Sequence, residues 1–304
     1  MEKTRGRARG DRGALTPRPL HFAGVLLGAA SLFASACDAP PPFKHSRVLG
    51  GKSVCADTLG AGRSAYRNYC LHCHGAEGDG NGPAGRALDP RPRDFTKGTF
   101  KFASVRAGEL PTDADLIRVT KRGLAGTGML PWDIPDGEIQ AAIQYLKTFS
   151  PRWRRELPGD PVTAGPDPWN RRDAAALERG RAVYHAIARC WACHPAYISR
   201  NGILASTGGI EPREHVDEPA VPVGGDEKFR TRAPDFLRDN IRSGTDTLDL
   251  YRSIACGLGG TAMPTYKGAL REDDLWALVR YVQWLTRQRG GPGVEAVRRR
   301  MRGP

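Results

Sequence analysis

Two short segments of the chain carry residues that together could hold a redox cofactor. Cys70-Leu71-His72-Cys73-His74 places two thiols three residues apart with a histidine directly after them, and Cys190-Trp191-Ala192-Cys193-His194 repeats the pattern. With seven Cys and seven His among 304 residues, composition alone gives about 0.004 such matches per chain, and two matches on the order of 10⁻⁵. The two segments are therefore expected to share one chemistry.

Two thiols on one helical turn point the same way, so both can form thioethers with the vinyl groups of one porphyrin while the next residue reaches the iron. The pattern predicts two covalently bound haem c groups, held by Cys70, Cys73, His74, Cys190, Cys193 and His194. A structural zinc ion on the four cysteines and a thioredoxin-like redox pair are the alternatives. Neither explains the histidine after each pair, and no strand-helix-strand pattern precedes either pair.

The surroundings of the two segments also repeat. Asp115-Leu-Ile-Arg118 parallels Asp249-Leu-Tyr-Arg252, and the Gly-rich segment 122–129 aligns with 256–263. A period of roughly 120 to 135 residues indicates a duplicated domain, because solenoid repeats are far shorter. We therefore expect two tandem domains, over 55–150 and 174–287.

Helical patterns position these residues. Gly62 and Tyr66 lie eight and four residues before Cys70, so all three share one face of a helix. Further helices are expected over 112–122, 136–149 and 273–285, and residues 75–85 are too rich in Gly to be anything but a tight loop. With helices at both ends of each domain and no alternating strand pattern, the predicted fold class is all-α.

The second copy departs from the first in two ways. Gly180 and Tyr184 lie two residues further from the haem motif than their counterparts do. The stretch from His194 to Met263 is also longer than the matching stretch from His74 to Met129, so residues 198–230 are expected to contain an inserted surface loop. His215 lies in this loop and is interpreted as a solvated side chain rather than a ligand.

The motifs resemble class I cytochrome c, in which such a Gly and aromatic residue pack against the C-terminal helix. In that family, a loop carbonyl accepts the proton on the other ring nitrogen of the iron-binding histidine, and Pro83 matches that position; a simple turn proline is the alternative. Arg91 and Arg93 could pair with haem propionates or be solvated. The resemblance covers 55–149 and 174–286 and looks closest to two-domain dihaem cytochromes c of bacterial respiratory chains. It implies redox partner proteins of such a chain.

The methionines add a second ligand for each iron. Apart from Met1 and Met301, the chain has only Met129 and Met263, and both fall at the same point of the repeat. A methionine that merely filled a core would have no reason to coincide in this way. By the Met/His ligation of cytochromes c, Met129 and Met263 are expected to complete six-coordinate irons.

The N-terminus is typical of an export signal. Basic residues between Lys3 and Arg18 precede an apolar run over 22–33, which is short for a membrane-spanning helix. The following Ala34-Ser35-Ala36-Cys37 suits signal cleavage, and Cys37 resembles the acylated cysteine of bacterial lipoproteins, with plain secretion as the alternative. We expect residues 1–36 to be removed and a lipid on Cys37 to hold the protein at the periplasmic side of a bacterial membrane.

Composition assigns the remaining segments. A flexible tether is expected over 37–54, a Pro-rich linker over 151–173 and a basic tail over 288–304. Of the formal net charge of +13, residues 1–36 contribute +4 and residues 287–304 contribute +5. A leader and a solvated tail thus explain the high isoelectric point, and no nucleic-acid binding is expected. Docking of the tail on anionic lipid is the alternative.

Six-coordinate iron has no vacant site for a substrate, so the sequence predicts electron transfer without a small-molecule substrate rather than an enzyme. The protein would be a free carrier or the cytochrome subunit of a respiratory complex. The alternative from another class is a dihaem peroxidase that reduces hydrogen peroxide, which needs one iron to lose its distal ligand. Cys55 and Cys256 are left over, and they are either small buried side chains or a disulfide between the two domains.

Overall fold

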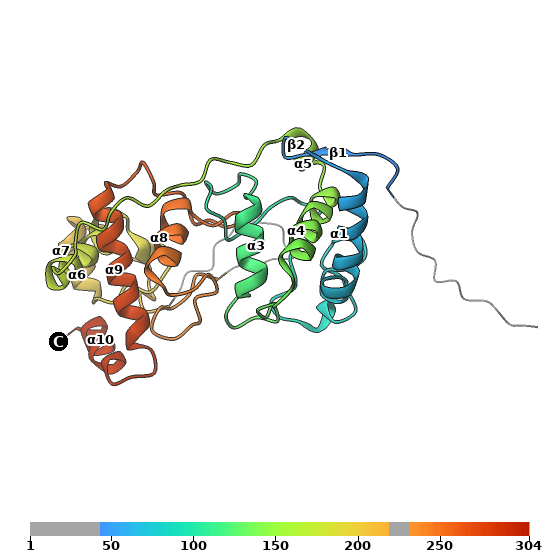
Figure 1. Cartoon of the computed structure of the whole chain (residues 1–304). Coiled ribbons are helices and arrows are strands. Elements are labelled where there is room, and N and C mark those ends of the chain that lie inside the picture. The colour runs from blue at the N-terminus through green and yellow to red at the C-terminus, as the bar shows by residue number, and fades with distance from the viewer. Residues whose placement is uncertain (1–42, 219–231, 304) are drawn as a thin grey trace, which may run out of the picture. The chain divides into compact units, whose positions relative to one another are not determined.

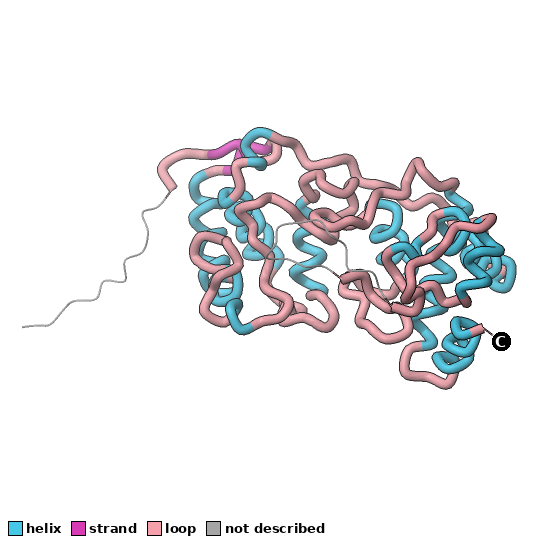
Figure 2. The backbone as a smooth tube through the Cα atoms, turned by 180° about the vertical axis from the view of Figure 1, so that it is seen from behind, coloured by secondary structure: helices cyan, strands magenta, loops and turns pink. Residues whose placement is uncertain are grey.

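The computed structural model describes residues 43–218 and 232–303. The leader and Cys37 lie outside the described residues. The described part is mostly helical, as predicted, and its one sheet is a two-stranded hairpin (Figure 2). The elements of the N-terminal half are β1 (Arg47–Leu49), β2 (Lys52–Val54), α1 (Ala56–Tyr69), α2 (Leu71–His74), the 3-10 turn η1 (Gly85–Ala87), α3 (Asp113–Arg122), α4 (Asp136–Leu146), the 3-10 turn η2 (Lys147–Phe149) and α5 (Arg152–Arg155) (Figure 1).

The C-terminal half repeats much of this order (Figure 1). Its described elements are α6 (Asp173–Ala182), the π-helical turn η3 (Val183–Ile187), the 3-10 turn η4 (Cys190–Ala192), α7 (Arg200–Thr207), α8 (Thr247–Cys256), α9 (Glu272–Gln288) and α10 (Gly293–Arg302). None of the helices in the described ranges combines the length and the apolar composition that crossing a membrane requires.

Helices α1 and α4 pack against each other in the N-terminal half. Gly62 makes this packing close: a Cβ at this position would overlap the carbonyl oxygen of Ala141 and lie 2.9 Å from the Cβ of Tyr145. Tyr66 is buried on the same face of α1. The predicted shared face of Gly62 and Tyr66 is therefore confirmed, and the missing side chain of Gly62 explains how the two backbones approach.

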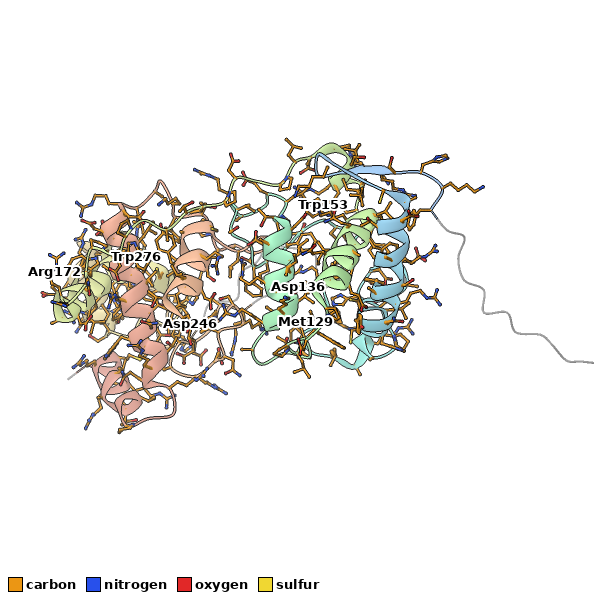
Figure 3. The ribbon with its side chains drawn as sticks, viewed as in Figure 1. Met129, Asp136, Trp153, Arg172, Asp246 and Trp276 are labelled. Atoms are coloured by element: carbon orange, nitrogen blue, oxygen red, sulfur yellow. The ribbon has the colours of Figure 1, made fainter. Side chains whose placement is uncertain are left out.

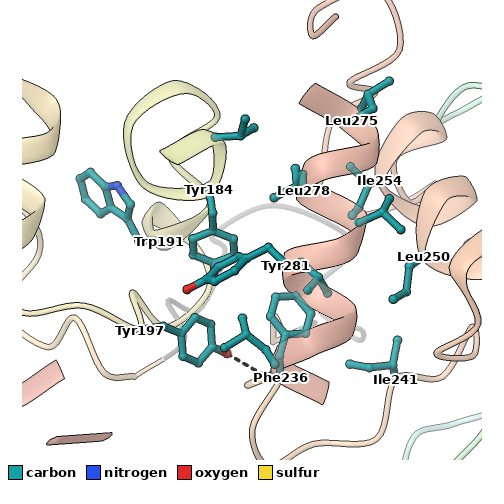
Figure 4. Packing of buried hydrophobic residues seen from close by; sticks show 14 of the residues in the cluster. Tyr184, Trp191, Tyr197, Phe236, Ile241, Leu250, Ile254, Leu275, Leu278 and Tyr281 are labelled. Atoms are coloured by element: carbon teal, nitrogen blue, oxygen red, sulfur yellow. Dashed lines mark hydrogen bonds between the residues drawn. The ribbon is translucent and has the colours of Figure 1, made fainter. Parts of the chain in front are cut away.

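The same packing occurs between α6 and α9 in the C-terminal half. A Cβ on Gly180 would overlap the carbonyl oxygen of Ala277 and lie 2.6 Å from the Cβ of Tyr281. Tyr184 is fully buried, and its ring centroid lies 5.5 Å from that of Tyr281 (Figure 4). The C-terminal half thus buries its own hydrophobic cluster, separate from the cluster around Tyr66.

The two extra residues between Gly180 and Cys190 have a visible structural consequence. Helix α6 widens into the π-helical turn η3, and Arg189 just before the haem motif has a left-handed backbone with φ of 50°. A π turn adds a residue to a helix while keeping the flanking residues on their faces. Gly180 and Tyr184 therefore keep their contacts despite the changed spacing.

The repeated Asp-x-x-Arg segments lie at the starts of α3 and α8, where both aspartates are buried. In α3, Asp115 and Thr112 form a capping box, and Arg118 binds Asp115 at 2.7 Å. Burial alone would raise the pKa of Asp115, but the hydrogen bonds from Ser104 and Arg118 outweigh it and lower that pKa. In α8, Asp249 pairs with Arg252 at 3.0 Å.

The predicted flexible tether is wrong for its last residues, because 47–54 form the β1–β2 hairpin. Gly50 and Gly51 make the turn with φ of 58° and 79°, a conformation that favours glycine. Leu49 and Val54 are buried beside Trp153 of α5 in the N-terminal cluster. The hairpin therefore belongs to the folded domain.

The Pro-rich linker over 151–173 is more ordered than its composition suggests. It begins with α5, whose Trp153 is 1% exposed. The N–H of Gly159 then donates to the carbonyl of Leu110 at 2.9 Å, and the N–H of Gly165 donates to Glu272 at 3.2 Å. The linker is thus bonded to both halves of the described chain.

Two further segments are more structured than predicted. The inserted segment contains α7, whose Ile203 is fully buried, so it is not only a surface loop; His215 within it is exposed, as expected. Residues 219–231 of the segment lie outside the described ranges.

The basic tail forms the helix α10, which buries Val297 against the C-terminal cluster and leaves its arginines outside. Every third or fourth residue of the tail is apolar, which is why it packs as a helix.

Backbone hydrogen bonds join the two halves directly. The N–H of Ala107 donates to the carbonyl of Cys256 at 2.8 Å and to Oγ1 of Thr265 at 3.2 Å. Arg122 at the end of α3 pairs with Asp249 at 2.9 Å. The Gly-rich segment of the second copy, which begins at Cys256, therefore lies against residues of the first copy.

Candidate functional site: a cavity lined by both Cys-x-x-Cys-His motifs

Both motif histidines donate from Nδ1 to a backbone carbonyl. His74 donates to the carbonyl of Arg93 at 3.1 Å, and His194 donates to the carbonyl of Pro234 at 2.9 Å. This hydrogen bond places the proton on Nδ1 and leaves Nε2 with a free lone pair, as an iron ligand requires. The expected acceptor in the first copy, Pro83, is wrong: the carbonyl comes from residue 93, beyond the glycine loop.

A phenylalanine stacks on each motif histidine. The ring centroids of His74 and Phe95 are 4.4 Å apart, and those of His194 and Phe236 are 4.7 Å apart, both at 19° between planes. Burial lowers the pKa of both histidines, which favours the neutral imidazole. The sequence analysis missed these phenylalanines and the carbonyls beside them.

A signal for them was present in the sequence. Arg91-Pro-Arg-Asp-Phe95 and Arg232-Ala-Pro-Asp-Phe236 share the pattern Arg-x-x-Asp-Phe. In both copies the residue that supplies the carbonyl comes two positions before the stacked phenylalanine. Recognition of this shorter repeat would have identified both acceptors.

The buried tyrosines hold the chain that leaves each motif. Tyr66 donates its hydroxyl proton to the carbonyl of Gly75 at 2.8 Å, and Tyr184 donates to the carbonyl of Pro195 at 2.7 Å. Each acceptor is the residue directly after a motif histidine. The replacement of glycine by Pro195 in the second copy therefore preserves this contact, because only the carbonyl is used.

The loop around Met129 is fixed by its own hydrogen bonds. The N–H of Leu124 donates to the carbonyl of Met129 at 2.8 Å. Thr127 accepts from the N–H of Met129 at 3.1 Å and donates to the carbonyl of Leu124 at 2.8 Å. Gly123 opens the loop with φ of 65°, a conformation that favours glycine.

The loop around Met263 has the same hydrogen bonds. The N–H of Leu258 donates to the carbonyl of Met263 at 3.2 Å. Thr261 accepts from the N–H of Met263 at 3.1 Å and donates to the carbonyl of Leu258 at 2.8 Å. The two methionines therefore occupy equivalent places in two loops of one design, including the left-handed glycine, Gly257, at φ of 73°.

Both methionines and all the predicted attachment residues except Cys193 line one cavity of about 710 Å³. From the first copy it is lined by Cys70, Cys73, His74 and Met129, and from the second by Cys190, His194 and Met263. Burial raises the pKa of the Cys70 thiol and of the Cys190 thiol to about 12. Among the described residues no three His, Cys, Asp or Glu side chains group closely enough to hold a metal ion by themselves, so a four-cysteine zinc site lacks the geometry that it needs.

Basic side chains line the same cavity. They are Arg91, Arg93, Lys101, Arg232 and Arg242. Burial, together with the nearby Arg93 and Arg242, lowers the pKa of Lys101 to about 8. An anionic group in the cavity would be stabilised by these charges. The sequence analysis named only Arg91 and Arg93 for this role and missed Lys101, Arg232 and Arg242.

The two remaining cysteines of the described chain are free thiols, so the disulfide alternative is wrong here. Cys55 is exposed at the start of α1, whereas Cys256 is fully buried at the end of α8. A hydrogen bond with Thr58 lowers the pKa of the Cys55 thiol, and burial raises the pKa of the Cys256 thiol to about 11.

We expect these two thiols to differ strongly in reactivity. Iodoacetamide without reductant should modify Cys55 in the folded protein, while Cys256 should react only after denaturation, because alkylation needs an accessible thiolate. Peptide mapping by mass spectrometry measures the modification of each cysteine. The variant Cys55→Ser should lose the modification seen in the folded protein and keep that of Cys256 after denaturation. A cross-linked Cys55–Cys256 peptide in the non-reduced digest would contradict the structure.

The chain is similar in sequence to a family of cytochromes and in fold to a chain of known structure. Residues 57–146 match the family model described as cytochrome c oxidase, cbb3-type, subunit III. A chain of the solved "Kuenenia stuttgartiensis reducing HAO-like protein complex Kustc0457/Kustc0458" is 30% identical, with a TM-score of 0.60, and the match covers 74% of this chain and 95% of that chain. No curated protein matches the chain significantly.

The helical fold and the Cys-x-x-Cys-His motif beside a cavity define a c-type cytochrome, a class of electron-transfer protein. This chain belongs to the class I c-type cytochromes, and its 57–146 segment carries the cytochrome c domain of the cbb3-type subunit III family. Covalently bound haem c follows from this membership.

Haem c fits the residues of the N-terminal half. Cys70 and Cys73 would hold it by thioethers, and His74 and Met129, which line the same cavity, would bind the iron. The hydrogen bond from His74 Nδ1 leaves Nε2 for the iron, and the cavity wall is largely apolar around it. The group would supply one-electron chemistry, and these residues would set its orientation.

Proposed function

We propose that the chain is a dihaem cytochrome c that carries single electrons at the periplasmic side of a bacterial membrane. It would act as a carrier or as the cytochrome subunit of a respiratory complex, with redox proteins as partners. The observation that carries the proposal is the duplication of the whole site around the second motif. His194, Met263 and Phe236 repeat the hydrogen bonds and ring contacts of the first copy.

The second haem is proposed on four parallel contacts. A neutral histidine donates from Nδ1 to a backbone carbonyl, a phenylalanine stacks on it, a tyrosine binds the carbonyl after the motif, and a Thr-x-Met loop lines the cavity. The same four contacts frame the site that would hold the haem in the first copy. Cys190 and Cys193 would then attach the second haem.

The duplicated distal loops favour electron transfer over peroxide reduction. A peroxidase needs one iron without a distal side chain, so that peroxide can bind. Met129 and Met263 both line the cavity, and both loops are held by the same threonine hydrogen bonds.

A role inside a larger assembly is supported by the similar solved chain, which belongs to a structure described as a protein complex. The membrane location is proposed from the export signal over 1–36 and from Cys37 alone. A lipid on Cys37, followed by few residues before the β1–β2 hairpin, would keep the folded part close to the membrane surface.

Intact mass spectrometry of the protein purified from an exporting host tests the proposal. We expect a mature chain that begins at an acylated Cys37 and carries the added mass of two haems. Replacing both Cys190 and Cys193 by serine should remove the mass of one haem, whereas the matched change Cys55→Ser should remove none. One haem in the parent would contradict the dihaem assignment, and an N-terminus beyond Cys37 would remove the lipid anchor.

A further inference from the structure

The two distal loops are not equally open. Leu130 and Trp132, which follow Met129, are 64% and 39% exposed. Their counterparts after Met263 are Pro264, which is also exposed, and Tyr266, which is partly buried against the C-terminal cluster, so the difference lies at the aromatic residue.

The loop of the second copy is covered by the first half of the chain. Ala107 donates its N–H to Thr265 Oγ1 at 3.2 Å, and a Cβ on Gly259 would overlap the carbonyl oxygen of Phe100. Gly126 of the first loop also lies against the second half, since a Cβ there would come 2.8 Å from Nδ2 of Asn240, but Leu130 and Trp132 stay exposed. A redox partner could therefore reach the first distal loop at these two side chains.

Acidic side chains surround the exposed residues of the first loop. Asp133 follows Trp132 directly, and the rings of Trp132 and Tyr69 meet edge-to-face at 5.9 Å between centroids. Tyr69 hydrogen-bonds Glu138, which is exposed. Asp136, labelled with Met129 in Figure 3, is also exposed, and Lys121 forms an ion pair with it.

This patch opposes the charge of the chain as a whole. The protein carries a formal net charge of +13, yet the charged groups named here beside two exposed apolar side chains are three carboxylates and one lysine. An exposed apolar centre with a charged rim is typical of a transient protein interface, and the rim sets partner choice and the association rate. The charge of the rim therefore selects a basic partner surface.

Resting on the proposed function, we propose that Leu130, Trp132 and the carboxylates of Asp133, Asp136 and Glu138 form the docking surface for a redox protein with a basic, apolar-centred face. One electron would pass between the partner's cofactor and the iron bound by Met129, so that one centre is oxidised as the other is reduced. The second haem, behind its covered loop, would exchange electrons through the first.

Stopped-flow kinetics with a purified basic monohaem cytochrome c as the probe tests this surface. In the thermodynamically favourable direction and at low salt, Asp133→Asn with Glu138→Gln should slow electron exchange about three- to tenfold and flatten its salt dependence. Leu130→Ser should slow the exchange at low and high salt alike. The matched controls are Glu178→Gln and Leu157→Ser, which change exposed residues elsewhere and should leave the rates unchanged.

Hexacyanoferrate(III), a small anion, separates this proposal from the function itself. The carboxylate variant should react with it at the parent rate or faster, because the repulsion is reduced. If the docking variants carry two haems and exchange electrons with the basic cytochrome at the parent rate, the docking surface is refuted and the proposed function stands. A chain without covalent haem would overturn both.

Discussion

Replacing Gly62 by alanine is expected to destabilise the N-terminal half by about 1 to 2 kcal/mol. The new Cβ would overlap the carbonyl oxygen of Ala141 and lie 2.7 Å from its carbonyl carbon, and a backbone neighbour cannot move aside as a flexible side chain can. Overpacking of this kind typically costs about 1 to 3 kcal/mol and sometimes more. The better helix propensity of alanine offsets about 1 kcal/mol of this destabilisation.

The same helix supplies a matched control. Gly60 lies in α1, and no heavy atom comes within 4 Å of the position that a Cβ would take there, so Gly60→Ala should stabilise the protein by roughly 0.5 to 1 kcal/mol. Guanidinium chloride unfolding followed by circular dichroism compares the two variants. Equal midpoints for Gly62→Ala and the parent would show that α1 and α4 do not pack as closely as described.

The main helices were predictable because each has a regular apolar face or a clear cap. The predicted helix over 112–122 differs from α3 by one residue, and its capping residue is Thr112. The helix predicted over 273–285 is the centre of the longer α9 (Glu272–Gln288). In these segments local propensity and tertiary packing favour the same structure, so the sequence pattern is sufficient.

The hairpin and α10 were not predicted, because their order depends on partners elsewhere in the chain. Leu49 is buried only because Trp153, about a hundred residues later, lies in the same cluster. Val294, Val297 and Met301 lie at helical spacing among arginines, but the burial of Val297 depends on the C-terminal cluster. Composition suggested a tether and a solvated tail, since each strand of the hairpin is only three residues long and the tail has few apolar residues among its arginines.

In the candidate site, too, some residues could be predicted from local sequence patterns and others depend on the path of the folded chain. Spacing and duplication alone identify the two motifs and the two methionines, and the structure places them along one cavity. The acceptor of the His74 proton was wrong because a carbonyl has no residue-type signature: any residue can supply it. Only the chain path through the glycine loop decides that Arg93, rather than Pro83, comes within 3.1 Å.

The second copy has two more residues between its helix glycine, Gly180, and its first motif cysteine, Cys190, than the first copy has. Two added residues would rotate a regular helix by about 200° and turn Gly180 away from α9. The π-helical turn η3 and the left-handed Arg189 absorb the addition instead, so Gly180 still meets Ala277. Side-chain contacts are thus preserved where sequence spacing is not.

Met263→Ala is expected to open the second iron to external ligands. The thioether of Met263 lines the same cavity as the motif histidine, and the short side chain of alanine cannot reach the iron from the same loop. The reduced parent should bind carbon monoxide poorly at neutral pH, because the proposed Met/His ligation leaves both irons six-coordinate, whereas the variant should bind one equivalent readily. A carbon monoxide titration followed by the Soret absorption measures the difference, which we expect to exceed roughly tenfold in apparent affinity, or about 1.4 kcal/mol.

The control for this experiment is Met301→Ala, which removes a methionine that packs on the C-terminal cluster outside the cavity. It should leave carbon monoxide binding unchanged, even where it lowers stability. Met129→Ala should open the first iron in the same way, and the double variant should bind two equivalents. Ready binding by the parent would instead mean that one iron already lacks its distal ligand, which is the arrangement a peroxidase needs. The titration therefore separates the two functions by the number of equivalents bound, independently of any partner protein.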